Sequence, residues 1–470
     1  MESENEQLPS LINLEHESGQ AITVVAQAIA DAGGRAVIVG GAVRDALLGA
    51  DPKDLDLEVY GIVVDELEEI LTKRYRIDQV GKSFGVFIIK GLDIDVALPR
   101  RERKSGTGHK AFAIEGDPEM TFAEAAARRD FTINAISWDP LTGELIDPAG
   151  GRADLQQRVL RHVSHQFAED PLRVLRAMQF LARFEFSIAP ETMELCRSIE
   201  PEDLPKERLF EEWAKLIRKG RKPSLGLNFL RDCGWIRYYS ELEALVGCEQ
   251  DPEWHPEGDV WVHTLHCMDA FARKRLGDEW EDLVVGFAVL LHDIAKPPTT
   301  FVDENGRIRS PGHDVEGVPI AETFLRRLTA HADLIAQVLP LIETHLRPME
   351  LYKVKASDAA IRRLARKVGR IDRLLRVADA DMGGRPPKSA DFPAGDWLRE
   401  RAEKLAVRDS IPKPIVQGRH LIEIGLKPGP QFKAILDACY EAQLDGKFAE
   451  IGEGIGFARD VVAENDTNLT

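Results

Sequence analysis

Two aspartates one residue apart follow a glycine turn near the start of the 470-residue chain. The apolar run 36–39 predicts a short strand, and the glycine pair that ends in Gly41 lets backbone N–H groups approach a triphosphate at the start of the next helix, where Arg44 faces the same anion. On a strand, Asp54 and Asp56 would emerge from one face and could hold one or two magnesium ions. Two metal ions are what an in-line attack on an α-phosphate needs, so this segment predicts a nucleotidyl-transfer site.

A second set of candidate residues lies in the C-terminal half and consists of histidines and aspartates. The predicted metal ligands are His263, His292, Asp293, His313, His345 and Asp381. Asp379 is the alternative to Asp381, and the Gly-Arg pair that follows favours Asp381. A lone His-Asp pair is most often structural, but this order of partners resembles that of the HD phosphohydrolases. Such a site suits Mg²⁺, Mn²⁺ or Ni²⁺ and would activate water against a phosphate ester.

A small sheet and a helix would position the N-terminal carboxylates. The pattern predicts a helix over 22–32 and strands over 36–39, 75–80, 86–89 and 92–97. Asp95 falls on the last of these strands. The basic segment 100–110 contains two glycines and is expected to form a loop between a strand and a helix. Later, a turn-rich boundary at 251–259 and a proline- and glycine-rich linker at 383–393 separate helical regions.

The composition limits the kinds of partner that the chain can bind. With 61 Lys and Arg against 79 Asp and Glu, the net charge is −18, so binding to a nucleic-acid backbone would rely on local basic patches. Two such patches lie at 100–110 and from Lys353 to Arg376, although a solvated helix face explains the second equally well. No apolar run approaches a membrane span and the first residues are acidic, so we expect a cytoplasmic protein with no membrane contact. The five cysteines lack C-x-x-C spacing, and free thiols are expected.

The N-terminal motifs resemble those of the nucleotidyltransferase superfamily that includes polymerase β. The closer resemblance is to its bacterial class II branch, the tRNA CCA-adding enzymes and poly(A) polymerases. It implies that Asp95 is a third catalytic carboxylate, for which a solvated aspartate at a strand edge is the alternative. In the segment 128–136 it implies that Arg129 meets the triphosphate, Asp130 the sugar, and Asn134 the triphosphate or the metal region.

A further motif, Glu169-Asp170-x-x-Arg173, stands where the pattern predicts a helix start. Acids before a helix suit its positive end, so capping explains them without any function. By resemblance to class II enzymes, Asp170 and Arg173 pair with the edge of the incoming CTP or ATP, Glu169 holds the arginine, and Arg176 belongs to the same nucleotide-binding face. A carboxylate accepts the exocyclic amino hydrogen while a guanidinium donates to ring acceptors, and neither uracil nor guanine presents that edge. Base selection would then need no nucleic-acid template.

The resemblance extends over nearly the whole chain and implies an α+β fold. A polymerase-β-like nucleotidyltransferase head with a small mixed sheet would be followed by all-helical neck, HD and tail domains. The implied boundaries are a flexible extension over 1–20, the head over 21–155, a base-selecting and RNA-binding neck over 156–248, the HD domain over 249–385, and a linker and tRNA-binding tail over 386–470.

The expected function is that of a tRNA nucleotidyltransferase that adds C and A from CTP and ATP to the tRNA 3′ end, with Mg²⁺ at the head. The same resemblance implies 2′,3′-cyclic phosphodiesterase and phosphatase activity in the HD domain. A poly(A) polymerase, or an enzyme that adds only CC or only the last A, is the nearest alternative, because all share the head motifs. Alternatives from other classes are an HD phosphohydrolase with a non-catalytic RNA-binding head and a nucleotide-sensing regulator.

Overall fold

The computed structural model divides into two compact units, Met1–Leu204 and Pro205–Thr470. It describes residues 11, 12, 14, 16–52, 55–79, 85–92, 94–104, 112–201 and 204–467, with the side chains of 79, 101–104, 112–115 and 465–467 excepted. Asp54 therefore lies outside the described residues. The boundary between the units falls inside the range 156–248 that was predicted as the neck, and each unit is described by itself.

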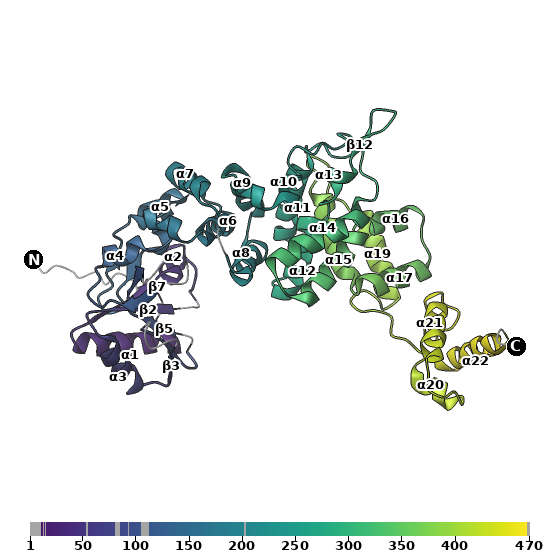
Figure 1. Ribbon diagram of the computed structural model, residues 1–470, viewed down its shortest axis with the longest axis horizontal. Coiled ribbons are helices and arrows are strands. Elements are labelled where there is room, and N and C mark those ends of the chain that lie inside the picture. Colours follow the sequence, from purple (N-terminus) through teal and green to yellow (C-terminus); the bar gives the residue numbers. More distant parts are fainter. Residues whose placement is uncertain are drawn as a thin grey trace, which may run out of the picture. The chain divides into compact units, whose positions relative to one another are not determined.

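The first unit contains a seven-stranded mixed sheet with the strand order β3-β4-β5-β2-β1-β8-β9 (Figure 1). Strands β2 and β5 pair in parallel, and the other neighbours pair antiparallel. The strands are β1 Arg35–Val39, β2 Leu55–Tyr60, β3 Ile77–Gln79, β4 Val86–Ile89, β5 Ile94–Ala97, β8 Ser137–Trp138 and β9 Leu145–Ile146. The α+β class and the small mixed sheet expected from the sequence are confirmed.

Helices α1 (Glu17–Asp31) and α3 (Val64–Thr72) lie side by side against this sheet (Figure 1). Ile22, Val25 and Ile29 are buried on α1 at helical spacing, which gives the helix one apolar stripe toward β1. The unit also contains α2 Gly41–Leu47, α4 Phe122–Ala127, α5 Gly151–Gln157, α6 Leu172–Phe184, α7 Pro190–Ser198, the 3₁₀ turns Thr132–Asn134 and His165–Glu169, and the paired strands β10 Val159–Leu160 and β11 Ser187–Ile188.

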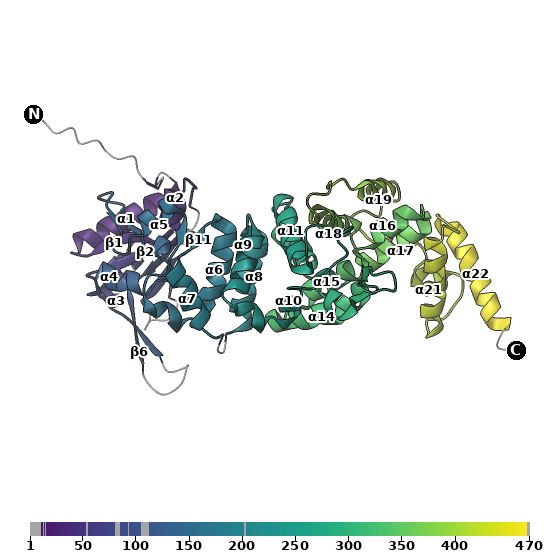
Figure 2. The ribbon, with the colours of Figure 1, turned by 90° about the horizontal axis from the view of Figure 1, so that it is seen from above.

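Strands β6 (Arg100–Lys104) and β7 (Phe112–Gly116) form an antiparallel hairpin, and in Figure 2 β6 extends away from the sheet of this unit. The prediction of a loop over 100–110 is wrong for its first five residues, which pair with β7 from Arg100–Gly116 to Lys104–Phe112. A run of charged residues carries little intrinsic strand preference, so only the pairing with β7 makes it a strand. Residues 105–111 lie outside the described part of the chain.

The second unit is helical, and α12 (Glu279–Leu291) lies in its core. Residues 282–291 of α12 are all buried, because α8, α11, α15 and α18 pack around it. The bounds of the other elements are α8 Lys206–Lys219, α9 Pro223–Asp232, a 3₁₀ turn Trp235–Tyr238, α10 Ser240–Glu243, α11 Val260–Arg273, α13 Lys296–Thr299, β12 Phe301–Val302, β13 Ile308–Arg309, α14 His313–Leu328, α15 Ala332–Thr344, α16 Arg347–Lys353, α17 Asp358–Val368 and α18 Ile371–Gly383. None of the helices in the described ranges has the length and apolarity needed to cross a membrane.

The last part of the chain has a small core of its own. Helices α20 (Gly418–Glu423), α21 (Gln431–Leu444) and α22 (Ile451–Thr467) enclose Val416, Leu421, Ile435 and Phe448. Figure 2 shows α21 and α22 side by side, as their contacts require. By contrast, α19 (Pro393–Lys404) packs against α16 and α18, so the range 386–470 predicted as linker and tail includes a helix that belongs to the larger helical core.

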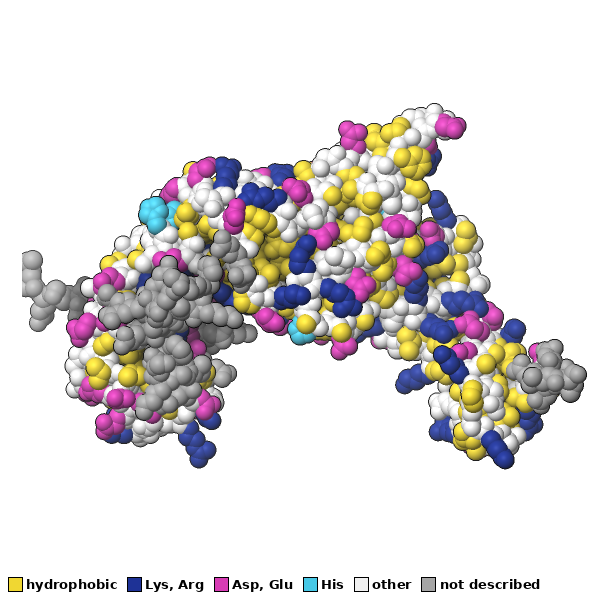
Figure 3. Space-filling model, viewed as in Figure 1, with side chains coloured by type: hydrophobic (Ala, Val, Ile, Leu, Met, Phe, Trp, Pro, Cys, Tyr) yellow, Lys and Arg dark blue, Asp and Glu magenta, His cyan; other side chains and the backbone are white. Residues whose placement is uncertain are grey.

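The basic residues between Lys353 and Arg376 are largely engaged in ion pairs. The pairs are Arg363–Asp445, Arg366–Glu441, Lys367–Glu343, Arg370–Glu281, Arg373–Glu281 and Arg376–Asp282. On the face shown in Figure 3, dark blue and magenta side chains are interspersed over the helical unit. These contacts favour the alternative of a paired, solvated helix face over a continuous RNA-binding patch.

Candidate functional site

The parallel pairing of β2 and β5 places Asp56 directly beside Asp95. Neighbouring strands lie about 4.8 Å apart, and paired positions point to the same face, so the two exposed carboxylates share one side of the sheet. Glu58, two residues after Asp56, points to the same face. Carboxylate oxygens are the ligands that Mg²⁺ prefers, so these residues fit a magnesium site. The contribution of Asp54 remains a prediction.

These three carboxylates line a cavity of about 310 Å³ together with Arg100, Arg128 and Arg129. Glu58 Oε2 accepts a hydrogen bond from Tyr60 Oη at 2.6 Å, and Arg129 lies 3.4 Å from Glu58 Oε1. A cavity with both carboxylates and guanidinium groups suits a polyphosphate carried with metal ions. The sequence interpretation missed Glu58, although its position two residues after Asp56 was the available signal.

The glycine turn leads into α2 next to the predicted arginines. Gly40 has a φ of 73°, a left-handed conformation that favours glycine, and begins α2 directly after β1. Arg44 is buried and donates to Asn134 Oδ1 at 2.5 Å and to Asp45 Oδ1 at 2.8 Å. Its guanidinium also lies over the rings of Phe180 and Phe184 on α6, at 5.2 and 4.7 Å from their centroids. In this structure Arg44 thus joins α2 to α6, and its predicted contact with a triphosphate remains a prediction.

Asp130 is buried at the centre of the same polar network. Its Oδ1 accepts from the Phe131 N–H at 2.7 Å and from Asn134 Nδ2 at 2.9 Å, and its Oδ2 accepts from Arg176 at 2.7 Å. Burial opposes ionisation of the carboxyl group, but Arg176 and these hydrogen bonds together hold the pKa of Asp130 below its usual range. The network therefore fixes α6 to the turn that precedes β8.

Arg176→Leu is expected to lower the free energy of unfolding at pH 7 by about 2 kcal/mol, because it leaves the Asp130 carboxylate buried without its cation. This value is at the low end of the cost of leaving a buried charge without its partner, because a third of the Arg176 side chain is exposed. The folded-state pKa of Asp130 lies below the unfolded value, so its ionisation stabilises the protein above about pH 3.9 and this stabilisation is lost as the pH falls through the folded-state pKa.

Urea unfolding of wild type and Arg176→Leu across pH measures this effect. The difference in stability should shrink toward low pH, and a difference that is constant with pH would contradict the assignment. Arg197→Leu is the matched control, since Arg197 forms an exposed ion pair with Glu194 on α7, and we expect a change within about 0.5 kcal/mol.

The predicted base-reading pair lies at the start of α6. Asp170 Oδ1 accepts from the Leu172 N–H at 3.1 Å, which is the capping contact expected of an acid in this place. Arg173 donates to the carbonyl oxygens of Gln166 at 2.8 Å and Arg128 at 2.6 Å. The Arg128 side chain lines the carboxylate cavity, so Arg173 is anchored to a segment of that cavity wall.

Burial lowers the pKa of Arg173, and the nearby carboxylates of Asp130, Asp170 and the exposed Glu169 offset this lowering only in part. The hydrogen bonds that hold Arg173 come from the two carbonyl groups. The nucleotide contacts of Asp170 and Arg173, and the part of Glu169, remain predictions.

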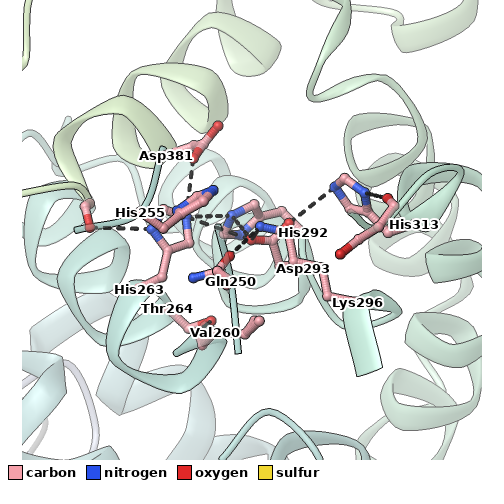
Figure 4. Close-up of polar contacts among 12 residues, drawn as sticks. Gln250, His255, Val260, His263, Thr264, His292, Asp293, Lys296, His313 and Asp381 are labelled. Atoms are coloured by element: carbon pink, nitrogen blue, oxygen red, sulfur yellow. Dashed lines mark hydrogen bonds and ion pairs between the residues drawn. The ribbon is translucent and has the colours of Figure 1, made fainter. Parts of the chain in front are cut away.

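In the second unit, residues from five helical segments converge on one buried cluster (Figure 4). His263 comes from α11, and its Nε2 lies 3.1 Å from Asp381 Oδ1 of α18 and 3.4 Å from His292 Nε2. One ligand atom from each of these residues and from Cys267 lies within 4.8 Å of the others. The structure thus brings together His263, His292 and Asp381, which are far apart in the sequence.

A second group of ligand atoms adjoins the first. Asp293 Oδ1 lies 3.2 Å from His313 Nε2 and 3.9 Å from His345 Nε2, and these two rings are 3.3 Å apart at Nε2. The other oxygen of Asp293 lies 3.3 Å from His292 Nε2. Asp293 therefore stands between the two groups, and all six predicted ligands are gathered here.

Hydrogen bonds at Nδ1 orient all four imidazole rings. His292, His313 and His345 each face a backbone carbonyl, of Val289, Ser310 and Ile342, at 2.7 Å. His263 Nδ1 instead lies 2.8 Å from Glu257 Oε1, which also contacts His255 at 2.9 Å. Such partners leave Nε2 for a metal and raise the basicity of the ligand. Glu257 and His255 were missed by the sequence interpretation, because neither stands in the recognised order of ligands.

Asp379 and Asp381 have different surroundings. Asp379 forms an ion pair with Lys274 at 2.7 Å at the surface, whereas Asp381 is buried and contacts both His263 and Arg385. Of the two alternatives, Asp381 therefore has the position of a ligand.

The cluster combines buried carboxylates with buried cations, since Asp293 pairs with Lys296 and Asp381 pairs with Arg385. Although burial lowers the pKa of an imidazole, Asp293 and Cys267 raise the pKa of His292 to about 10. Asp293 Oδ2 also lacks a hydrogen bond of suitable geometry, with Lys296 Nζ 2.8 Å away as an ion pair. A buried oxygen of this kind and a field that attracts positive charge fit a divalent metal site. A metal site in this region agrees with the metal ligands that the sequence predicts. The choice among Mg²⁺, Mn²⁺ and Ni²⁺ remains a prediction.

A cavity of about 270 Å³ gives access to this cluster. Its lining includes Asp293 and Asp381, the cations Lys296 and Arg385, and Trp254, whose side chain is 56% exposed. Lys296 donates to Gln250 Oε1 at 2.6 Å. A small cavity with metal-ligating groups and two cations can hold a phosphate ester, and the exposed indole offers a surface on which a base could stack.

Comparison with family models matches three regions of the chain. Residues 36–161 match the poly A polymerase head domain, residues 185–245 a probable RNA and SrmB-binding site of polymerase A, and residues 260–381 the HD domain. These matches place the chain in the poly(A) polymerase family, with an HD domain in its second half. The head model includes β1, β2 and β5 with Asp56 and Asp95, and the HD model runs from the start of α11 to Asp381. The resemblance seen in the sequence is thus confirmed for the family.

Solved structures of this family share the fold. A CCA-adding enzyme of Bacillus stearothermophilus in complex with CTP is 23% identical, with a TM-score of 0.66 over 96% of this chain and 100% of that one. A Thermotoga maritima CCA-adding enzyme complexed with tRNA is 18% identical, with a TM-score of 0.59 over 96% and 97% of the two chains. A CCA-adding enzyme with ATP is 19% identical, with a TM-score of 0.60 over 95% and 94%. At these identities the likeness concerns the fold.

Proposed function

We propose that the protein is a tRNA nucleotidyltransferase that adds C and A nucleotides from CTP and ATP to the 3′ end of tRNA. The observation that carries this proposal is the register of Asp56 and Asp95 on neighbouring parallel strands, inside a cavity that also presents three arginines. The family models and the likeness to CCA-adding enzymes whose structures contain CTP, ATP or tRNA support it. A cytoplasmic location is consistent with these substrates.

The residues that line the head cavity have distinct roles in this reaction. Asp56 and Asp95, with Asp54, would hold magnesium, which when bound lowers the charge barrier between the tRNA 3′-hydroxyl and the α-phosphate. Arg129 lies on the cavity wall and would bind the triphosphate. The 3′-oxygen forms the new bond to the α-phosphorus, the bond to the β-phosphate oxygen breaks, and pyrophosphate leaves.

Supplying CTP and ATP to tRNA that lacks its CCA end tests the proposal, and a product three nucleotides longer is the expected result.

For base selection we propose Asp170 and Arg173 as the protein template. Arg173→Ala should reduce the preference for CTP and ATP over UTP and GTP by roughly 10- to 100-fold, because a base-reading pair contributes about 1–3 kcal/mol of discrimination. The rates of CTP, UTP and GTP incorporation into tRNA that lacks its CCA end, and of ATP, UTP and GTP incorporation into tRNA ending in CC, measure this. Arg152→Ala, an exposed arginine on α5, is the matched control. Slower addition with unchanged selectivity would assign Arg173 a structural part only, through its bonds to the Gln166 and Arg128 carbonyls.

For the HD region we propose a metal-dependent phosphohydrolase that acts on the phosphorylated 3′ ends of RNA. The two adjoining groups of ligand atoms on either side of Asp293 would hold metal ions, which would supply activated water. Lys296 and Arg385 would bind the phosphate in the adjoining cavity. A 2′,3′-cyclic phosphate leaves no free 3′-hydroxyl, so its hydrolysis would prepare a damaged end for nucleotide addition.

A further inference from the structure

Cys267 lies one helical turn after His263 on α11, so both side chains point to the same side of the helix. That side faces His292 and Asp381, and a ligand atom from each of these four residues lies within 4.8 Å of the others. All four side chains are buried. Cys267 Sγ lies 3.3 Å from His263 Nε2. The thiol is therefore part of the ligand cluster by position.

The backbone near the end of α18 leaves room for this thiol. A Cβ atom at Gly384 would lie 2.2 Å from Cys267 Sγ, so only glycine allows the sulfur its present position. The same backbone turn carries Asp381, whose carbonyl oxygen lies 3.9 Å from Sγ. The sulfur thus approaches the segment that supplies one of the ligands.

The contact between Sγ and His263 Nε2 cannot persist when the site is loaded. His263 Nδ1 faces Glu257 at 2.8 Å and the Gly384 carbonyl at 3.2 Å, which leaves Nε2 as the atom that would bind a metal. A cation at Nε2 displaces the thiol hydrogen from that nitrogen, and Sγ then lies among the ligand atoms without its partner. Asp293 Oδ2 is a buried oxygen whose partner is the ion-paired Lys296 Nζ at 2.8 Å and which makes no hydrogen bond of suitable geometry. It lies 3.6 Å from His263 Nε2, so it is a further acceptor for a cation at the same place.

We propose that Cys267 is a metal ligand of the HD site and that its thiolate makes the site select Zn²⁺, Fe²⁺, Co²⁺ or Ni²⁺ over Mg²⁺ and Mn²⁺. This inference rests on the proposed metal site in the HD region. On binding, the Sγ–H bond breaks, the proton goes to solvent, and a metal–sulfur bond forms. A set of one sulfur, two imidazoles and one carboxylate is typical of borderline metals, whereas Mg²⁺ and Mn²⁺ prefer oxygen.

Cobalt substitution of the full-length protein tests the proposal directly. After removal of metal and addition of Co²⁺, wild type should show the near-ultraviolet charge-transfer band of a Co²⁺–thiolate bond. Cys267→Ser should lose this band while retaining bound Co²⁺ through the remaining ligands. Cys233→Ser is the matched control, because Cys233 is equally buried but lies at the end of α9 and contacts the Leu230 carbonyl; it should keep the band.

Other outcomes overturn the proposal in distinguishable ways. Bound Co²⁺ without the band in wild type, or a band that survives in Cys267→Ser, would show that the thiol is not a ligand while the metal site itself stands. Failure of wild type to bind Co²⁺ would remove the proposed metal site and this inference with it. A titration with Zn²⁺ and Mn²⁺ gives a second readout: Cys267→Ser should weaken Zn²⁺ binding by at least about 10-fold and leave Mn²⁺ binding nearly unchanged. Equal losses for both metals would contradict the selectivity.

Discussion

Asp56→Ala is expected to lower the rate of nucleotide addition to tRNA by about 10³-fold, which corresponds to about 4 kcal/mol of lost transition-state stabilisation. Asp56 is exposed on β2, beside Asp95 in the parallel register, so its removal takes a carboxylate from the proposed magnesium site without opening the core. The melting temperature should therefore change little. Single-turnover extension of tRNA that lacks its CCA end measures the rate.

Asp78→Ala is the matched control, because Asp78 is an exposed strand carboxylate of the same sheet that pairs with Lys90 away from the cavity. It should extend tRNA at the wild-type rate. Hydrolysis of 2′,3′-cyclic phosphates by the HD region should persist in Asp56→Ala. Full extension by Asp56→Ala would contradict the assignment of the head as a catalytic site, and would favour the alternative in which the head only binds RNA.

Asp293→Asn is expected to lower phosphohydrolase activity by about 10³-fold or more and to leave nucleotide addition unchanged. One oxygen of Asp293 faces His313 and His345, and the other faces His263 and His292, so a single substitution weakens both groups of ligand atoms. The asparagine keeps the size of the side chain, which protects the packing around it. Hydrolysis of a nucleoside 2′,3′-cyclic phosphate with added Mn²⁺, Ni²⁺ or Zn²⁺ measures the effect.

The control for this experiment is Asp379→Asn, which changes a surface carboxylate paired with Lys274. It should hydrolyse the substrate as wild type does. Loss of activity in Asp379→Asn together with full activity in Asp293→Asn would contradict the ligand assignment. Loss of nucleotide addition in Asp293→Asn with an unchanged melting temperature would show that the two activities depend on one another.

The sequence predicted the elements with strong local patterns. Strand 86–89 matches β4, and strand 36–39 differs from β1 by one residue, because each is a short continuous run of apolar residues. Helix α1 begins at Glu17 rather than near residue 22, since His16 caps it through the Gly19 N–H, and histidine is a rare signal for a helix start. Strand β6 was missed because its charged residues become a strand only through pairing with β7.

The candidate sites were likewise predicted where local sequence motifs define them and missed where contacts between distant segments do. The order of the motifs predicted a single metal site, and the structure gathers its six predicted ligands in one cluster: His263, His292, Asp293, His313, His345 and Asp381. Glu257 was not foreseen because it precedes α11 and joins the cluster only through its contact with His263. Cys267 was not foreseen because its part depends on which side of α11 faces α18. Ion pairing of the second basic patch with Glu281, Glu343 and Glu441 was also beyond the local pattern, since these partners come from other helices.

The central claim is that the head builds a CCA end on tRNA, and stepwise extension tests it most directly. Three labelled tRNAs, ending before the CCA, after the two Cs and after the complete end, would each be given CTP, ATP or both. The account predicts two additions with CTP alone on the first, one addition with ATP on the second, three additions with both nucleotides on the first, and none on the third. Long adenosine tails, extension of the second tRNA alone, or no product from any of them would contradict it.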